Sequence, residues 1–265
     1  MRKSKILVLS IVLLLGVGLL AGCTGDDGGQ AGEQPKDKAE KLVVGVDTSF
    51  VPFEFRNEET GNYEGFDIDM WAEIAKRLEV DYELSPMDFN ALIPSLQTDK
   101  IDAAIAGMTI KPERREKVDF SMPYYDSGLL IMVRADNSDI QGKEDLKGKV
   151  VGTKTGATSY DFVASIDGVK KNTPFPNITD AYMALRNGNV DAAVHDAPNV
   201  KYYIKTAGDG EVKTVGKLME GQSYGIAFPK GSELTAQVDE ALQAMKDDGT
   251  YNDIYEKWFG KQPEK

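Results

Sequence analysis

The sequence predicts an α/β protein built from two similar lobes, and three features carry this prediction. From Lys41 onward, short apolar runs typical of buried strands alternate with helical patterns of apolar residues. An ordered set of these segments recurs about 100 residues later in the chain. Two further apolar strands stand between and after the two sets, as expected if the chain leaves one lobe, builds the other and returns.

Ahead of the lobes, the chain begins with the pattern of an export signal. Three basic residues precede the apolar run 6–20, which is short for a membrane-spanning helix. The ending Leu20-Ala21-Gly22-Cys23 resembles the bacterial lipoprotein cleavage box, in which the cysteine becomes the lipidated N-terminus. We therefore expect a signal peptide at 1–22 and a lipid anchor on Cys23. The alternative is an uncleaved membrane anchor with an incidental cysteine; either places the body outside the cytoplasm, on the outer face of the cytoplasmic membrane or the periplasmic side.

Between this signal and the first strand lies a polar segment, residues 24–40, without a large apolar side chain. Such a segment cannot bury a core, so we expect a flexible tether with a reach of roughly 20–25 Å. Removal of the signal takes away three bases and no acids, so 31 basic residues become 28 and the net charge of −12 becomes −15. A body of this charge does not adhere to anionic lipid, and attachment must come from Cys23.

The composition excludes several kinds of site and partner. With 43 acidic against 31 basic residues, the chain has no excess of Lys and Arg to neutralise phosphates, which argues against a nucleic-acid partner. One cysteine and one histidine cannot form an internal disulfide, a thiolate cluster or a multi-histidine metal site. Nothing in the sequence suggests a metal or organic cofactor. At 41% hydrophobic and 28% charged residues, the body is ordinary for a globular protein.

The first set of segments opens the predicted body. Residues 43–45 predict a buried strand, and a helix follows. The inner face of this helix is formed by Ile68, Trp71, Ala72, Ala75 and Leu78. A second helix begins after Asp88, an expected N-cap, carries the apolar residues 91–96 and leads into a strand at 102–105. Trp71 here, and Trp258 near the end of the chain, are expected in the core.

The second set repeats this order. Residues 149–152 (KVVG) echo 41–45 (KLVVG). Residues 181–185 followed by 191–194 echo the second helix and strand of the first set. The alternative is chance matching of short strings, but the matching order of elements favours two similarly built lobes.

Two strands and two closing helices complete the predicted body. Apolar residues 128–135 and 224–230 predict the strands that cross between the lobes. The first closing helix carries apolar residues from Leu234 to Met245 and is expected to end at Gly249, and a short helix with Ile254, Trp258 and Phe259 follows. We therefore predict lobe 1 at 41–125 plus 225–265, lobe 2 at 126–224, and a hinge near 124–128 and 220–224.

Charged groups of both signs follow the repeated strands. In open α/β sheets, ligands bind beyond the carboxyl ends of the strands, so function is expected there. The residues at these ends are Asp47 and Phe50, then 106–109 with Arg114, then 154–159, and finally His195 with Asp196.

The body from Lys41 onward resembles the polar amino-acid-binding proteins of ABC importers, most nearly their glutamine-binding members. The resembling segments are DTSFVPFEF (47–55), GFDIDMWAEIAKRL (65–78), DYELSPMDF (81–89), AGMTIKPERR (106–115), PNITDAYMAL (176–185), VHDAPN (194–199), YGIAFPKGS (224–232) and DGTYNDIYEKWFG (248–260). The resemblance implies a two-lobe, periplasmic-binding-protein-like type II fold whose lobes are joined by two crossing hinge strands. It also implies a monomer that captures an amino acid between the lobes and delivers it to an ABC permease with its ATPase.

A zwitterionic amino acid needs a cation for its carboxylate and an anion for its ammonium. Arg114 can grip a carboxylate bidentately, although it could also be an exposed arginine in the charged run 113–116. Asp196 is the expected ammonium partner, and it could also cap a helix that begins at Ala197. Supporting donors are expected from Thr109 and from the amides around Ala106, Gly107, Thr109 and Thr158.

The resemblance also implies a wall and a side-chain pocket. Phe50 and Phe89 resemble the aromatic walls that enclose the ligand stem, although a phenylalanine is more often plain core. Asp47, Lys154 and His195 are expected to line the side-chain pocket. A carboxamide can donate to Asp47 and accept from Lys154, which matches glutamine.

Other amino acids fit this pocket less well. A glutamate would set its carboxylate against Asp47, at a cost of about 4 kcal/mol at about 4 Å, partly offset by Lys154. The positive side chain of a lysine or arginine ligand would in the same way be repelled by Lys154. Thr158 stands where the glutamine-binding pattern has glycine, so broader amino-acid specificity stays an alternative.

Two other kinds of function stay open from the sequence. The same two-lobe fold also hosts a dehydratase of cyclohexadienyl acids, and Asp47, Lys154, His195 and Asp196 could perform acid–base chemistry. Each of them has a simpler ligand-pairing role, so we expect no enzyme. A sensory receptor is the other alternative, and it would need a partner chain to signal.

Overall fold

The computed structural model describes residues 41–263. The predicted signal peptide, Cys23 and the predicted tether lie outside the described residues. Within the described part, no helix combines the length and apolar character needed to cross a bilayer.

The first lobe is built on a five-stranded sheet with the order β5-β1-β6-β13-β7. Its strands are β1 (Leu42–Val46), β5 (Tyr82–Pro86), β6 (Ala103–Ala104), β7 (Asp119–Phe120) and β13 (Ala227–Phe228). Strand β1 pairs in parallel with both β5 and β6, whereas β13 is antiparallel to β6 and β7. The helices of this lobe are α1 (Phe66–Leu78), α2 (Phe89–Gln97), α3 (Pro112–Arg115), α7 (Leu234–Asp247) and α8 (Thr250–Phe259). One apolar cluster joins the sheet to α1, α7 and α8, and another joins it to α2.

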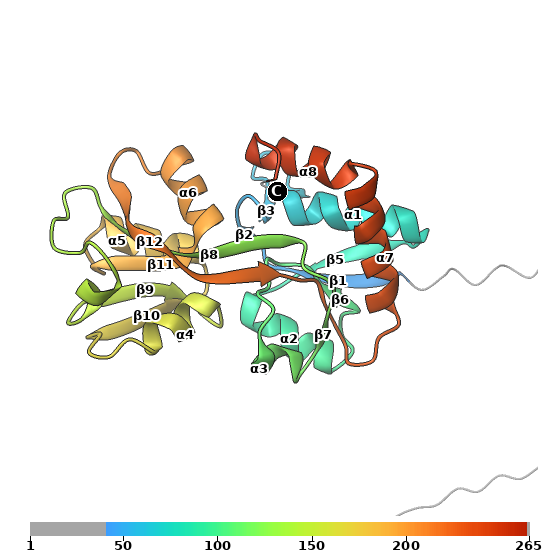
Figure 1. The fold of residues 1–265 in the computed structure, drawn as a ribbon, viewed down its shortest axis with the longest axis horizontal. Helices are drawn as coiled ribbons and strands as arrows, with labels where there is room; N and C mark the ends of the chain where they lie inside the picture. The colour runs from blue at the N-terminus through green and yellow to red at the C-terminus, as the bar shows by residue number, and fades with distance from the viewer. Residues whose placement is uncertain (1–40, 264–265) are drawn as a thin grey trace, which may run out of the picture. The chain divides into compact units, whose positions relative to one another are not determined.

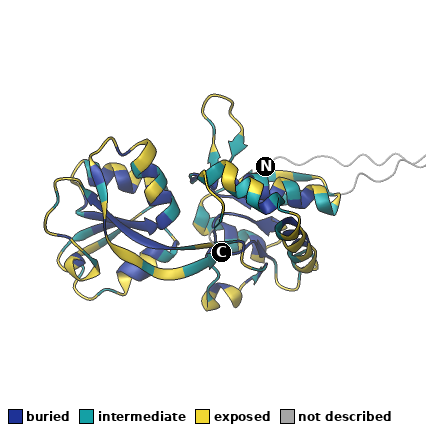
Figure 2. Cartoon of the chain, turned by 45° about the horizontal axis from the view of Figure 1, so that its top comes forward, coloured by how far each residue is buried: buried dark blue, intermediate teal, exposed yellow. Residues whose placement is uncertain are grey.

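The second lobe repeats this architecture with the order β10-β9-β11-β8-β12. Its strands are β8 (Tyr125–Arg134), β9 (Val150–Lys154), β10 (Lys171–Phe175), β11 (Ala192–Asp196) and β12 (Val212–Tyr224). The helices are α4 (Thr158–Ala164), α5 (Ile178–Arg186) and α6 (Ala197–Thr206), with a 3₁₀ turn at Lys143–Leu146. Buried strands lie inside the lobe while the outer faces of its helices are exposed (Figure 2).

Two long strands connect the lobes. β8 and β12 pair antiparallel from Arg134 and Val212 to Tyr125 and Tyr224, and they run side by side between the two sheets (Figure 1). Beyond this ladder, the Gly225 amide donates to the Met108 carbonyl at 3.0 Å, which ties the end of β12 to the first lobe. The predicted two-lobe α/β fold with two connecting strands is therefore confirmed, while the exact lobe boundaries stay a prediction.

A small third sheet packs beside the first lobe. It comprises β2 (Ser49–Phe50), β3 (Glu54–Arg56) and β4 (Tyr63–Glu64), in the order β2-β3-β4. The Phe50 and Phe53 rings stack at 4.9 Å between centroids. This sheet places Phe50 and Glu54 near the first turn of α1.

Four details differ from the sequence prediction. β5, β10 and the third sheet were not predicted. Residues 224–230, predicted as the second crossing strand, form no single strand: the strand that crosses is β12, which ends at Tyr224, and the chain then enters the first sheet as β13 at Ala227. α7 ends with Asp248 as its C-cap, and Gly249, at a φ of 88°, opens α8. Trp71 is fully buried, whereas Trp258 is only partly buried against the same core.

Candidate ligand site

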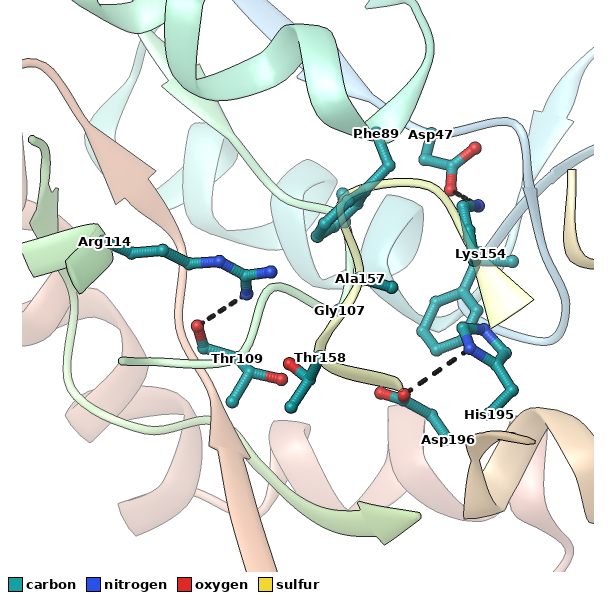
Figure 3. Close-up of a pocket in the computed structure, with 12 residues that line it drawn as sticks. Asp47, Phe89, Gly107, Thr109, Arg114, Lys154, Ala157, Thr158, His195 and Asp196 are labelled. Atoms are coloured by element: carbon teal, nitrogen blue, oxygen red, sulfur yellow. Dashed lines mark hydrogen bonds and ion pairs between the residues drawn. The ribbon is translucent and has the colours of Figure 1, made fainter. Parts of the chain in front are cut away.

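All eleven predicted site residues line one cavity. They are Asp47, Phe50, Phe89, Ala106, Gly107, Thr109, Arg114, Lys154, Thr158, His195 and Asp196, with Ala157 added by the structure. Figure 3 shows their side chains converging from both lobes on this space.

The topology explains why these residues meet. Asp47 follows β1, and Gly107 lies just beyond β6 in the first lobe. Lys154 ends β9, and Asp196 ends β11 in the second lobe. β1 and β6 are parallel neighbours, and so are β9 and β11. In each sheet the carboxyl ends of these two strands therefore lie side by side.

Arg114 is held in place by two carbonyl oxygens. Its guanidinium donates to the Thr109 carbonyl at 2.8 Å and to the Gly156 carbonyl of the second lobe at 3.0 Å. Its Cζ atom lies 5.2 Å from the centre of the Phe89 ring. Burial lowers the pKa of Arg114 below its usual value, opposed chiefly by the Asp196 carboxylate. The side chain is therefore buried beside the cavity, and the alternative of an exposed surface arginine is wrong.

Asp196 offers a negative charge to the same cavity. One of its carboxylate oxygens accepts a hydrogen bond from the Tyr224 hydroxyl at the end of β12. Its other oxygen lies 3.7 Å from Nδ1 of His195. Burial raises the pKa of Asp196 to about 6, although Tyr224 and the charge of Arg114 oppose the rise. Asp196 is the N-cap residue of α6 by position, but its side chain makes no capping hydrogen bond.

Asp47 and Lys154 form a direct ion pair across the lobes. The Lys154 side chain is only 2% exposed, and its Nζ atom also donates to the Ser49 hydroxyl at 3.1 Å. Nζ further lies 5.9 Å from the centre of the Phe89 ring. The pair carries no net charge. This end of the cavity therefore favours a neutral polar group over a positively or negatively charged group.

His195 is a neutral wall of the cavity. Burial, and then the charge of Lys154, lower the pKa of His195 well below its usual value. Its ring packs edge-on against Phe50 with centroids 5.5 Å apart. In the described part of the chain, Nε2 of His195 and Oγ1 of Thr158 are buried without a hydrogen-bond partner, so both can serve a bound molecule.

Besides Ser49, four residues that support the site were missed by the sequence analysis. Tyr224 holds Asp196, and the Gln222 side chain accepts from the Thr109 hydroxyl at 2.6 Å. Asp67 accepts from the Gly107 amide at 2.8 Å, and Asn199 donates to the Val51 carbonyl of the other lobe at 2.7 Å. Their roles depend on tertiary contacts; for Asp67 the available signal was a carboxylate between the apolar residues Phe66 and Ile68.

This fold and site define a two-lobe binding protein, and comparison with known proteins gives the family. Residues 42–261 match the model of the bacterial extracellular solute-binding proteins, family 3. The chain belongs to this family.

Individual relatives differ in the amino acid that they bind. The ABC transporter glutamine-binding protein GlnH of Bacillus subtilis (strain 168) is 35% identical, over 98% of each chain. The L-cystine-binding protein TcyA of the same organism is 30% identical, over 97% of this chain and 98% of the relative. The solved structure of an ancestral arginine-binding protein bound to glutamine is 46% identical with a TM-score of 0.80, and it covers 83% of this chain and 98% of its own. The solved structure of an ancestral arginine-binding protein bound to arginine is likewise 46% identical with a TM-score of 0.80, and it covers 83% of this chain and 98% of its own.

Proposed function

We propose that this protein is the extracytoplasmic receptor of an amino-acid ABC importer, that it captures L-glutamine between its lobes, and that it is anchored to the membrane by a lipid on Cys23. The observation that carries the choice of glutamine is the buried, mutually neutralised pair of Asp47 and Lys154 in a cavity that also holds Arg114 and Asp196.

The opposite charges of Arg114 and Asp196 support an α-amino acid. Two carbonyls hold the guanidinium of Arg114 at the cavity, where it would donate charge-assisted hydrogen bonds to the ligand carboxylate. Asp196 would accept the ligand ammonium while Tyr224 holds the carboxylate. Lobe 1 thus supplies the cation and lobe 2 the anion.

The neutral end of the cavity supports a carboxamide side chain. The glutamine amide would donate to Asp47 and accept from Lys154, so that both charged groups remain paired. A charged ligand side chain would instead break the balance of this pair. The glutamine-binding relative GlnH supports the same choice.

Binding would stabilise the closed arrangement of the lobes. The ligand touches Arg114 on one lobe and Asp196 on the other, so its affinity for the closed form exceeds that for an open form. β8 and β12 would flex near their first-lobe ends, where the hinge is predicted. The closed, loaded receptor would then dock on its permease.

Calorimetry with glutamine, glutamate, asparagine, arginine, cystine and histidine tests the specificity. Glutamine is expected to bind most tightly, and tighter binding of a charged amino acid or of cystine would overturn the choice. Glutamine uptake by cells that lack this protein separates transport from sensing, because a pure sensor would leave uptake intact.

The membrane anchor is tested separately by Cys23→Ser. The variant is expected in the soluble fraction or retained as an uncleaved precursor, whereas the parent sediments with membranes. Sedimentation of a processed variant with membranes would contradict the lipid anchor.

A further inference from the structure

Two carboxyl groups lie buried behind the loop that would bind the ligand, and neither lines the cavity. Glu54 belongs to β3 and Asp67 to the first turn of α1, and both side chains have 0% exposure. Buried ionisable groups without a structural partner are costly, so two of them together call for a physical reason.

One oxygen of Asp67 joins two parts of the binding machinery. Oδ2 accepts from the Gly107 amide at 2.8 Å and from the Tyr124 hydroxyl at 2.9 Å. Gly107 lies in the cavity wall, and Tyr124 immediately precedes the connecting strand β8. Gly107 has a φ of 51°, and a Cβ there would come within 2.3 Å of the Phe50 ring, so the loop has little freedom to find another partner.

Glu54 faces this carboxylate without any other partner. In the part of the chain that the structure describes, neither oxygen of Glu54 makes a hydrogen bond of ordinary geometry, nor does Oδ1 of Asp67. The charged groups that act on Glu54 are Asp67 on α1, Asp47 after β1 and Lys154 at the end of β9. Among the described residues, Lys154 is the cation that acts on Glu54, and it is already paired with Asp47.

These surroundings decide which carboxyl holds a proton at neutral pH. Burial, and then the charges of Asp67 and Asp47, raise the pKa of Glu54 well above its usual value. Burial raises the pKa of Asp67 to about 6, while the hydrogen bonds from Gly107 and Tyr124 oppose the rise. Asp67 also lies at a helix N-terminus, which favours its negative charge. The proton of the pair therefore belongs on Glu54, and Asp67 is the member that carries the negative charge.

We propose that Glu54 and Asp67 hold one proton between them and that, through this pair, Asp67 is a positioning residue that fixes Gly107 in the ligand loop and Tyr124 at the start of the hinge. The neutral Glu54 faces Asp67 as a proton donor, and Oδ2 of Asp67 stays free for its two donors. The inference rests on the proposed function only in that the loop is taken to bind the ligand.

The pair makes ligand binding depend on pH in two directions. Protonation of Asp67 in acid weakens its hydrogen bond with the Gly107 amide. Asp196 titrates in the same pH range, so both residues contribute to the fall in affinity in acid. As the pH rises, ionisation of Glu54 sets two charges side by side and displaces the loop. The ligand ammonium also loses its proton in alkali, so Glu54 causes only part of the alkaline fall in affinity.

The first experiment needs no ligand. The infrared spectrum of the unliganded protein at pH 7 is expected to contain the carbonyl band of a protonated buried carboxyl, and Glu54→Gln is expected to remove it. An unchanged band in Glu54→Gln, or no such band in the parent, would overturn the shared proton.

The second experiment tests the positioning role of Asp67. In Asp67→Asn, exchange of the Gly107 amide hydrogen in the unliganded protein is expected to accelerate about tenfold, and glutamine affinity to fall by about tenfold or more, because a charge-assisted hydrogen bond becomes a weaker neutral one. The matched control is Asp69→Asn on the same helix. Asp69 pairs with Lys257 and Trp258, away from the loop, so this variant is expected to keep the parent affinity and Gly107 exchange.

The alkaline side separates the two members of the pair. Glu54→Gln keeps a neutral donor and is expected to reduce the alkaline fall in affinity to the part that the ligand ammonium causes. Glu54→Ala is expected to bind more weakly than Glu54→Gln at pH 7. Parent-like Gly107 exchange in Asp67→Asn, or an unchanged alkaline fall in Glu54→Gln, would overturn the proposal. If the infrared and exchange results hold but no amino acid binds, the proposed function fails and the pair stands.

Discussion

At the scale of single residues, the site depends on buried charged side chains that neighbouring groups fix by hydrogen bonds or ion pairs. Arg114 is fixed by the Thr109 and Gly156 carbonyls, which lie in different lobes. The planar fork of arginine can satisfy both and still present donors to a carboxylate, whereas the single ammonium of lysine cannot.

Arg114→Lys is therefore expected to weaken glutamine binding by at least about tenfold, because bidentate geometry is lost while the charge is kept. Calorimetry measures the change. Arg115→Lys is the matched control, since Arg115 is exposed and its guanidinium lies over Phe120 outside the cavity. Equal losses in the two variants would contradict the assigned role.

Asp196 links ligand affinity to pH. Its pKa of about 6 in the unliganded site means that a protonated, neutral form accumulates as the pH falls below 6. The ligand ammonium needs the ionised form, so glutamine affinity is expected to fall with acidity below this pH. Calorimetry between pH 5 and 8 measures it, and Asp196→Asn should flatten the part of the curve that Asp196 causes.

The same group affects folding stability with a definite sign. Its folded pKa lies above the usual value of 3.8, so the native state binds the proton more tightly than the unfolded state. The contribution of Asp196 to the free energy of unfolding is therefore fully present below about pH 4 and is lost as the pH rises through about 6. Urea unfolding of the unliganded protein should show a smaller loss of stability from pH 4 to 7 in Asp196→Asn than in the parent. Parallel curves would count against the raised pKa.

At the scale of secondary-structure elements, the start of α6 holds the lobes together outside the cavity. Asn199 is buried, accepts from the Tyr182 hydroxyl at 2.7 Å and donates to the Val51 carbonyl of the first lobe at 2.7 Å. The side chain thus stabilises the closed arrangement without lining the ligand cavity.

Asn199→Ala is expected to lower affinity by about threefold to tenfold for every amino acid that binds, the range of a lost neutral hydrogen bond. The ratio between two ligands should stay constant, because only the closing equilibrium changes. Calorimetry with two ligands measures both quantities, with the exposed Asn187→Ala as control. A change in the ratio would show that Asn199 acts on the ligand itself.

The elements also show how far the sequence could be used for prediction. The site residues were predictable because they follow parallel strands, whose carboxyl ends meet at one edge. β5 and β10 were not, because both are edge strands that carry a proline and little apolar alternation, Pro86 and Pro174. The burial of Asp67 was not predictable either, since its partners Gly107 and Tyr124 lie 40 and 57 residues away.

At the scale of the whole described body, the ligand would act as a bridge between two cores. Each lobe has its own buried apolar clusters, and the lobes share the two strands β8 and β12 and a few polar contacts around the cavity. Lys111 and Asp161 add an ion pair at 2.6 Å near the rim, whose exposure limits its contribution to stability. Two lobes joined in this way can unfold separately unless something couples them.

Glutamine is expected to provide that coupling. At 1,000 times its dissociation constant, it should raise the free energy of unfolding by about 4 kcal/mol, because it binds only the native state. Since it contacts Arg114 in one lobe and Asp196 in the other, both lobes must stay folded for this gain. Calorimetric melting should therefore show one cooperative transition with glutamine, with equal calorimetric and van't Hoff enthalpies. In Arg114→Ala at the same glutamine concentration, both the rise in melting temperature and the coupling of the lobes should be lost. If the parent instead shows two transitions and glutamine raises the temperature of only one, the ligand binds a single lobe.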